Sequence, residues 1–379
     1  MGNIGSSAIS GICKLKFPLI AAVFVLGFVL VPTQAEALDF AKNIGGQNDL
    51  MLPYDVEVDS QGRIIVTNVM GVNSDMGVSI FDSSGNLLET FGSFGTAPGE
   101  FKSPTGVAID SKDRIIVADK QMNSIRIHDK SGEHIKTFGG IGSEDGQLRS
   151  PFGVAIDSQD RIIVADTNNN RVQIFDSEGN FVQKLVDVGS GENYMNYVAD
   201  VATDSQDRIW VVDAQNNRLV IYDKEGKFVK TVGRQGGGDA EFYFPQGIGV
   251  DKDDRVLVSD QLNYRVQILD SEGNFIETFG YQGNDDGRFM VITGITSDLA
   301  GNILVADQSN NKLSQWGSAS AQIDPPSQQI EAGPEDTEVK KIPDWINNTM
   351  QWYLDGVISE DEMISAIQFL VKEGIIILD

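Results

Sequence analysis

The most constraining feature of this sequence is a segment of about 47 residues that recurs along most of the chain. Residues 150–185 read "SPFGVAIDSQDRIIVADTNNNRVQIFDSEGNFVQKL", and neighbouring segments repeat this text closely. The first spacing between copies is 51 residues and the other four are 47, as shown by the residue that ends the second apolar run: Asn68, Asp119, Asp166, Asp213, Asp260 and Asp307. Repeats of this kind indicate a unit that buries its apolar surface only by stacking on its neighbours.

Each copy predicts a small antiparallel sheet of four strands. In residues 150–185 the runs "GVAID", "IIVAD", "RVQIF" and "FVQKL" are separated by turn sequences such as "SQDR" and "SEGN". A sheet this small needs partners on both faces, and a radial ring of six sheets leaves few exposed edges. We therefore expect an all-β fold, a six-bladed β-propeller.

The repeated text also resembles a known family. The motifs Pro-x-Gly-Val-Ala-x-Asp, Arg-Ile-x-Val-Ala-Asp, Asn-x-Arg-Val and Phe-Asp-x-x-Gly are similar to those of NHL-repeat β-propellers, over residues 38–317. The resemblance implies the propeller fold, and a fold of this type names no substrate.

The ends of the repeat region predict how the ring closes. The sixth copy stops at Gly317 before a fourth strand, whereas "LDFAKNIGG", residues 38–46, stands where a fourth strand would precede the first copy. We expect this N-terminal strand to complete the last blade.

Residues 1–37 predict a signal peptide. Lys14 and Lys16 precede an apolar run over residues 17–31, and Ala35 and Ala37 offer a cleavage site. An uncleaved membrane anchor is the alternative, although the run is shorter than the roughly 20 residues that span a bilayer. We expect an extracytoplasmic protein, secreted or attached to the cell surface, and the chain's one cysteine, Cys13, lies in the removed segment.

The region after the repeats predicts a linker and a helical hairpin. Residues 318–341 are rich in Pro, Ser and Glu, and residues 342–379 carry a capping box at Ser359 and Glu362 and a terminating Gly374. This tail resembles a C-terminal module of exported proteins from ammonia-oxidising archaea. The resemblance implies association with an envelope partner.

The charge of the chain narrows the classes of partner. With 55 acidic and 29 basic residues, the net charge of −26 disfavours nucleic acid, whose phosphates need a basic surface. Membrane contact is expected only if the signal segment stays in place.

No catalytic residue is assigned from the sequence. The two histidines, His128 and His134, fall at the end of a third strand and the start of a fourth, so we expect structural or surface roles for them. A multi-histidine zinc site is excluded, and without a cysteine in the mature chain a thiolate nucleophile is excluded too.

The repeated aspartates are candidate ligands for a cation. Most have an asparagine and a basic residue three and five positions later, as Asp166 has Asn169 and Arg171, which predicts local structural pairing. Asp119 is followed instead by Met122 and Ser124, so we expect it to lack this partner and to be the aspartate most open to ligand binding. The alternative is a carboxylate ring that holds calcium in a propeller hydrolase or lyase; otherwise no cofactor and no metal site is expected.

The aromatic residues give the leading functional hypothesis. The short turns predict one face of the ring, the turn face, and the longer connections predict the opposite one, the loop face, built from residues 93–103, 140–150, 187–197, 234–244 and 281–291. One periodic position on these connections is expected to fill the core: Phe101, Leu148, Met195, Phe242 and Phe289.

Five other aromatic residues are not periodic and lie at or next to the starts of first strands, near the predicted channel mouth: Tyr54, Phe152, Tyr197, Tyr243 and Phe244. We expect a binding or scaffold protein whose loop face meets a protein or a glycan. Partial burial under the long connections, without a ligand, is the alternative for these rings, and a purely structural envelope component is the alternative for the protein.

Overall fold

A computed structural model describes residues 38–46, 49–69, 77–185 and 194–318. The predicted signal peptide, nearly all of the linker and the predicted helical hairpin lie outside these residues. Within the described ranges, no helix is long and apolar enough to cross a bilayer.

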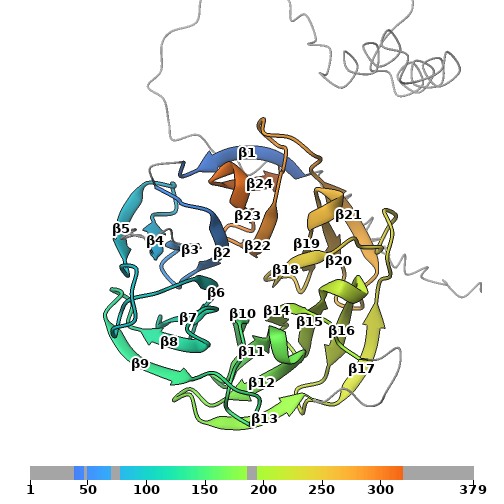
Figure 1. The fold of residues 1–379 in the computed structure, drawn as a ribbon. Coiled ribbons are helices and arrows are strands. Elements are labelled where there is room, and N and C mark those ends of the chain that lie inside the picture. Colours follow the sequence, from blue (N-terminus) through green and yellow to red (C-terminus); the bar gives the residue numbers. More distant parts are fainter. Residues whose placement is uncertain (1–37, 47–48, 70–76, 186–193, 319–379) are drawn as a thin grey trace, which may run out of the picture. The chain divides into compact units, whose positions relative to one another are not determined.

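The described residues form six four-stranded antiparallel sheets arranged as blades around a central axis (Figure 1). The predicted all-β six-bladed propeller is therefore confirmed. The strands of blades 1 to 3 are β2 (Pro53–Val58), β3 (Ile64–Asn68), β4 (Val78–Phe81) and β5 (Leu87–Phe91); β6 (Pro104–Ile109), β7 (Ile115–Asp119), β8 (Ser124–His128) and β9 (His134–Gly139); and β10 (Pro151–Ile156), β11 (Ile162–Asp166), β12 (Arg171–Phe175) and β13 (Phe181–Leu185).

Blades 4 to 6 follow the same order from the axis outward, except that the last blade takes its outermost strand from the N-terminal end. Their strands are β14 (Val198–Thr203), β15 (Ile209–Asp213), β16 (Arg218–Tyr222) and β17 (Phe228–Val232); β18 (Pro245–Val250), β19 (Val256–Asp260), β20 (Arg265–Leu269) and β21 (Phe275–Phe279); and β22 (Ile292–Ser297), β23 (Ile303–Asp307), β24 (Lys312–Ser318) and β1 (Leu38–Ile44).

Blade 6 closes the ring as the sequence predicts. β1 pairs antiparallel with β24, with Leu38 opposite Ser318 and Ile44 opposite Leu313. The Phe40 and Trp316 rings meet edge to face at 5.8 Å, and Ile44 is buried in the cluster between blades 6 and 1. One sheet thus joins the two ends of the repeat region without a disulfide.

The core lies between the blades rather than within them. Six apolar clusters are present among the described residues, one at each interface of neighbouring sheets. The five predicted core residues on the long connections are fully buried: Phe101, Leu148, Met195, Phe242 and Phe289. Each blade therefore depends on both neighbours to bury its apolar surface.

On the turn face, a serine of one blade is bound by an aspartate of the next. The backbone N–H and the hydroxyl of Ser158 donate to the Asp207 carboxylate at 2.9 and 2.7 Å. Asp207 has a left-handed backbone with φ 58°, which turns its carboxylate towards the neighbouring blade. The same clamp recurs in three further pairs: Ser60 with Asp113, Ser111 with Asp160, and Ser205 with Asp254.

On the loop face, the connection between the second and third strands is a short 3-10 turn in four blades. The turns are η1 (Thr167–Asn169), η2 (Ala214–Asn216), η3 (Gln261–Asn263) and η4 (Gln308–Asn310). An asparagine in the left-handed conformation ends three of them, for example Asn170 with φ 51°. Its amide oxygen then accepts a backbone N–H from the next blade, as Asn170 does from Tyr197 at 2.8 Å.

The closing strand supplies a direct test of this architecture. Ile44→Ala removes a fully buried side chain at the seam, so we expect a loss of about 2–4 kcal/mol in the free energy of unfolding. Asp39→Ala on the same strand changes an exposed side chain and serves as the control. Chemical denaturation of both variants checks the prediction, and equal stability would contradict the role of β1 in closing the ring.

Candidate functional site: the loop face and the channel

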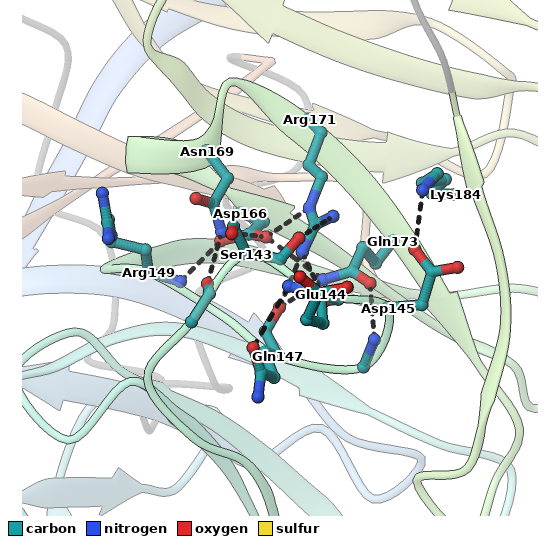
Figure 2. A network of polar contacts seen from close by, with 12 residues as sticks. Ser143, Glu144, Asp145, Gln147, Arg149, Asp166, Asn169, Arg171, Gln173 and Lys184 are labelled. Atoms are coloured by element: carbon teal, nitrogen blue, oxygen red, sulfur yellow. Dashed lines mark hydrogen bonds and ion pairs between the residues drawn. The ribbon is translucent and has the colours of Figure 1, made fainter.

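The repeated aspartates have structural partners, as the sequence predicts. The Asp166 carboxylate accepts hydrogen bonds from Asn169 at 2.8 Å, from the Arg171 guanidinium at 2.7 Å and from Gln173 at 3.1 Å (Figure 2). It also accepts the backbone N–H of Arg149 at 2.7 Å. The network fixes the long connection of one blade to its own second strand, so it leaves this carboxylate no free role.

Asp119 does not lack a partner, which corrects the sequence expectation. Its carboxylate accepts the backbone N–H groups of Lys102, Ser103 and Met122 at 2.8–3.1 Å. The Arg126 guanidinium lies 3.9 Å away, and this arginine comes from the position that carries Gln173 in the next copy. The countercharge has moved by two residues, and Asp119 is fully buried.

Four of the five predicted aromatic residues form one continuous row of ring contacts at the starts of the inner strands. The ring centroids of Tyr54 and Phe152 are 5.6 Å apart, those of Phe152 and Tyr197 are 5.6 Å apart, and those of Tyr197 and Phe244 are 5.7 Å apart. These residues come from blades 1, 3, 4 and 5, and blade 1 lies opposite blade 4, so the row crosses the channel mouth. Phe152 is buried, while Tyr54, Tyr197 and Phe244 are half-buried.

Two of these aromatic residues have an unusual backbone. Tyr197 and Phe244 have φ of 60° and 53°, in the left-handed region that bulky side chains avoid. The amide oxygens of Asn170 and Asn217 hold them there, each accepting a backbone N–H at 2.8 Å. The conformation costs on the order of 1 kcal/mol at each position and directs both rings towards the channel mouth row.

Tyr243 lies beside the row rather than in it. Its backbone N–H donates to Asp260 at 2.7 Å and its carbonyl accepts from Leu262 at 3.0 Å. Its side chain is 45% exposed, and that of Leu262 is 41% exposed. We define the aromatic sector as Tyr54, Phe152, Tyr197, Tyr243 and Phe244.

Two buried carboxylates in the channel were missed by the sequence analysis. Asp55 and Asp200 stand on the inner strands of blades 1 and 4, which face each other across the axis (Figure 1). The other four copies have glycine at this position: Gly106, Gly153, Gly247 and Gly294. The departure from glycine was the signal that could have revealed them.

Glycine in the preceding blade makes room for each of these carboxylates. A Cβ atom at Gly153 would lie 1.9 Å from an Asp200 oxygen, and one at Gly294 would lie 2.0 Å from an Asp55 oxygen. Each carboxylate bridges to the following blade: Asp55 accepts the N–H of Val107 at 2.8 Å, and Asp200 that of Ile248 at 3.0 Å. Each also accepts the N–H of the next residue in its own strand.

The channel carboxylates carry strongly perturbed acidities. Burial raises the pKa of Asp55 to about 7, against two backbone hydrogen bonds that lower it. Burial likewise raises the pKa of Glu57 to about 7, and burial together with the charge of Asp55 raises the pKa of Asp200. These three groups line a cavity of about 120 Å³ with valine, alanine and isoleucine side chains, and no lysine or arginine lines it.

Tyr54 covers the loop side of these carboxylates. Its hydroxyl lies 3.4 Å from the amide oxygen of Gln246 in blade 5, so the ring reaches across the channel. Burial raises the pKa of Tyr54, and the negative charges of Asp200 and Asp55 add to that shift. In the part of the chain that the structure describes, no three His, Cys, Asp or Glu side chains converge in a way that could hold a metal ion.

His128 lies in the apolar core rather than in the channel. Its ring is 0% exposed and packs between Phe91 and Phe101, with centroid distances of 5.0 and 5.3 Å. Burial lowers the pKa of His128 to about 4. His134 packs edge to face against it at 5.5 Å on the outer strand β9.

The raised pKa of Asp55 predicts that its contribution to the free energy of unfolding decreases as pH rises. Its proton stabilises the fold fully below the ordinary value of 3.8, and this contribution is lost as pH rises through about 7. Asp55→Asn should therefore gain stability relative to wild type as pH rises from 4 to 7, by about 1.4 kcal/mol per pH unit. Unfolding measured across this range checks the slope, with exposed Asp239→Asn as the control; parallel profiles for wild type and Asp55→Asn would contradict it.

The lowered pKa of His128 predicts that its contribution to the free energy of unfolding decreases as pH falls. Its contribution is fully present above the ordinary value of 6.5 and is lost as pH falls through about 4, because the unfolded chain takes up the proton first. Phenylalanine is the residue at the equivalent position of the next copy, Phe175, so His128→Phe should fold and lose less stability than wild type on acidification, by about 1.4 kcal/mol per pH unit. Thermal melts between pH 7 and 4 measure this, and an unchanged acid slope would rule out the assignment.

Comparison with known proteins agrees with the fold. An NHL repeat model matches residues 148–175, and a family described as a 6-bladed beta-propeller matches residues 195–256. No curated protein matches the sequence.

Solved structures resemble the chain at low sequence identity. A structural genomics protein of unknown function from Bacteroides thetaiotaomicron aligns with a TM-score of 0.58 at 14% identity, covering 75% of this chain and 76% of that one. A streptogramin B lyase structure aligns with a TM-score of 0.52 at 14% identity, covering 74% and 97%. An auxiliary nutrient binding protein from Bacteroides ovatus aligns with a TM-score of 0.54 at 13% identity, covering 75% and 77%. Sequence and structure together show a six-bladed β-propeller with an NHL repeat.

Proposed function

We propose that the protein is an exported, non-enzymatic binding protein whose loop face takes a protein or a glycan ligand over the aromatic sector. The observation that carries this proposal is the left-handed backbone of Tyr197 and Phe244. A scaffold gains nothing from bulky residues there, since Ser150 fills the same position in blade 3. Backbone strain of this kind collects at ligand-binding surfaces, where the surrounding structure holds it in place.

The chemistry of the aromatic sector supports binding. Tyrosine and phenylalanine rings offer large contact areas at low conformational cost, and a half-exposed tyrosine adds a hydroxyl for hydrogen bonding. Two solved structures of similar fold are described as auxiliary nutrient binding proteins, which is consistent with a loop face used for capture.

A propeller hydrolase or lyase is the second candidate, and one observation favours it. Carboxylates with pKa values near 7, such as Asp55 and Glu57, suit general acid–base chemistry. Against it, Asp55 and Asp200 each accept two backbone N–H groups and lie beneath Tyr54. A histidine-to-alanine variant of a virginiamycin B lyase of similar fold from Staphylococcus aureus is described as catalytically inactive, whereas His128 here is buried in the core. Turnover that Asp55→Asn abolishes without loss of fold would favour the enzyme.

Export and envelope attachment remain part of the proposal, carried by the sequence of residues 1–37 and 342–379. The signal segment would deliver the propeller outside the cytoplasm, and the tail would hold it at an envelope partner. Deletion of residues 342–379 should shift the protein from the envelope fraction to the medium, as measured by fractionation and immunoblotting. Retention of the truncated chain at the envelope would contradict the tether.

The loop face is tested by a matched pair of tyrosines. Tyr243→Ala in the aromatic sector should weaken ligand retention on immobilised envelope glycans and proteins about tenfold or more, because it removes an exposed ring from the contact surface. Tyr281→Ala removes a ring that is 58% exposed elsewhere on the loop face and should leave retention unchanged. Thermal melts confirm that both variants fold, and equal retention by wild type and Tyr243→Ala would reject this surface.

A further inference from the structure

Three basic side chains on the loop face have no acidic partner. Lys102, Lys120 and Arg149 form no ion pair among the described residues, although the chain carries a net charge of −26. Arg149 gives its backbone N–H to the Asp166 network, while its side chain extends away from that network (Figure 2). Elsewhere, half-buried guanidinium groups such as that of Arg208 bind carboxylates at 2.6 Å.

These residues lie on the loop face of two neighbouring blades, Lys102 and Lys120 on blade 2 and Arg149 at the start of blade 3. The backbone N–H of Lys120 donates to the carbonyl of Ser103, the residue after Lys102, at 3.0 Å. Ser150, the residue after Arg149, donates its N–H to Asn123 of blade 2 at 2.9 Å. We call Lys102, Lys120 and Arg149 the basic sector.

The basic sector adjoins the aromatic sector directly. The Lys120 ammonium group lies 4.4 Å from the centre of the Phe152 ring, and Phe152 begins the contacts that lead to Tyr197 and Phe244. A cation over an aromatic face keeps part of its electrostatic stabilisation when it leaves water. Burial lowers the pKa of Lys120, and an anion placed beside it would offset that cost.

Both sectors are departures from the repeat. The positions equivalent to Lys120 hold uncharged residues: Val69, Thr167, Ala214, Gln261 and Gln308. The position of Lys102 and Arg149 holds Asn196 and then Tyr243 in blades 4 and 5. Charge in blades 2 and 3 thus gives way to aromatic surface in blades 4 and 5 along one ring of the loop face.

Exposed amides lie along the same ring. Gln121, Asn168 and Gln215 occupy one repeated position in blades 2, 3 and 4, and all three side chains are exposed. An amide both donates and accepts hydrogen bonds, which matches the hydroxyl groups of a sugar better than an apolar peptide side chain.

We propose that the loop face binds an acidic glycan, with a sugar carboxylate at the basic sector and neighbouring sugar rings stacked on the aromatic sector. The positive C–H face of a pyranose ring complements the negative face of a tyrosine or phenylalanine ring. Carboxylates meet lysine and arginine through charge-assisted hydrogen bonds. This assignment rests on the proposed binding function and names its ligand class.

The test compares an oligogalacturonate with a neutral galacto-oligosaccharide of equal length, using the full chain and isothermal titration. Wild type should bind the acidic oligosaccharide at least tenfold more tightly, and added salt should weaken only that binding. Lys120→Gln should lose this preference about tenfold while Lys120→Arg retains most of it. Lys130→Gln, an exposed lysine on the turn face, is the control for net charge.

The outcomes separate this inference from the function on which it rests. Equal binding of both sugars by wild type and Lys120→Gln, with loss in Tyr243→Ala, overturns the acidic ligand and leaves the binding function in place. Tighter binding of a poly-glutamate peptide than of the oligogalacturonate overturns the glycan assignment. Absence of binding to either sugar or to the peptide, together with unchanged envelope retention in Tyr243→Ala, overturns both.

Discussion

The packing of each blade against two neighbours is the constraint on which this structure depends. A four-stranded sheet with apolar residues on both faces has no stable existence alone, and the six core clusters lie between sheets. Strand β1 satisfies this constraint at the last interface, because it gives blade 6 a fourth strand and buries Ile44 against blade 1. The one cysteine of the chain, Cys13, precedes the propeller, so strand pairing closes the ring without a disulfide.

The fold could be predicted from the sequence because the same pattern of strands and turns recurs six times. Core residues such as Phe101 and Phe242, and the closing strand, follow from their register in the repeat. The Asp119 partner did not follow, because Arg126 reaches it from a different position of the strand. Asp55 and Asp200 were missed for another reason. Each is accommodated by a glycine in the preceding blade and accepts a backbone N–H from the following blade. These contacts join residues about 50 or more positions apart, so no single copy of the repeat shows them.

Residues that follow the repeat and residues that depart from it make different contacts in this propeller. Residues that recur in most copies bind each other across blades, as the serine–aspartate pairs of the turn face do. Several residues that depart from the repeat lie around the axis and on the loop face, among them Asp55, Asp200 and Lys120. Asp55 and His128 change the stability of the fold in opposite directions between pH 4 and 7, since burial raises the pKa of Asp55 and lowers that of His128. At neutral pH the contribution of the buried His128 to stability is therefore fully present, whereas that of the protonated Asp55 is being lost.

The serine–aspartate clamp has a pattern with a mechanical meaning. It joins blades 1 to 5 in series, but the serine position holds Lys252 and Leu299 in blades 5 and 6, and the matching aspartate position holds Gly301 and Gly62 in blades 6 and 1. Neither of these pairs offers a carboxylate to a hydroxyl. The sheet assembled from both ends of the repeat region is therefore also the one least fastened on its turn face. Tension applied at the two ends of the repeat region would load this sheet first, because both of its interfaces lack the clamp that holds the other four.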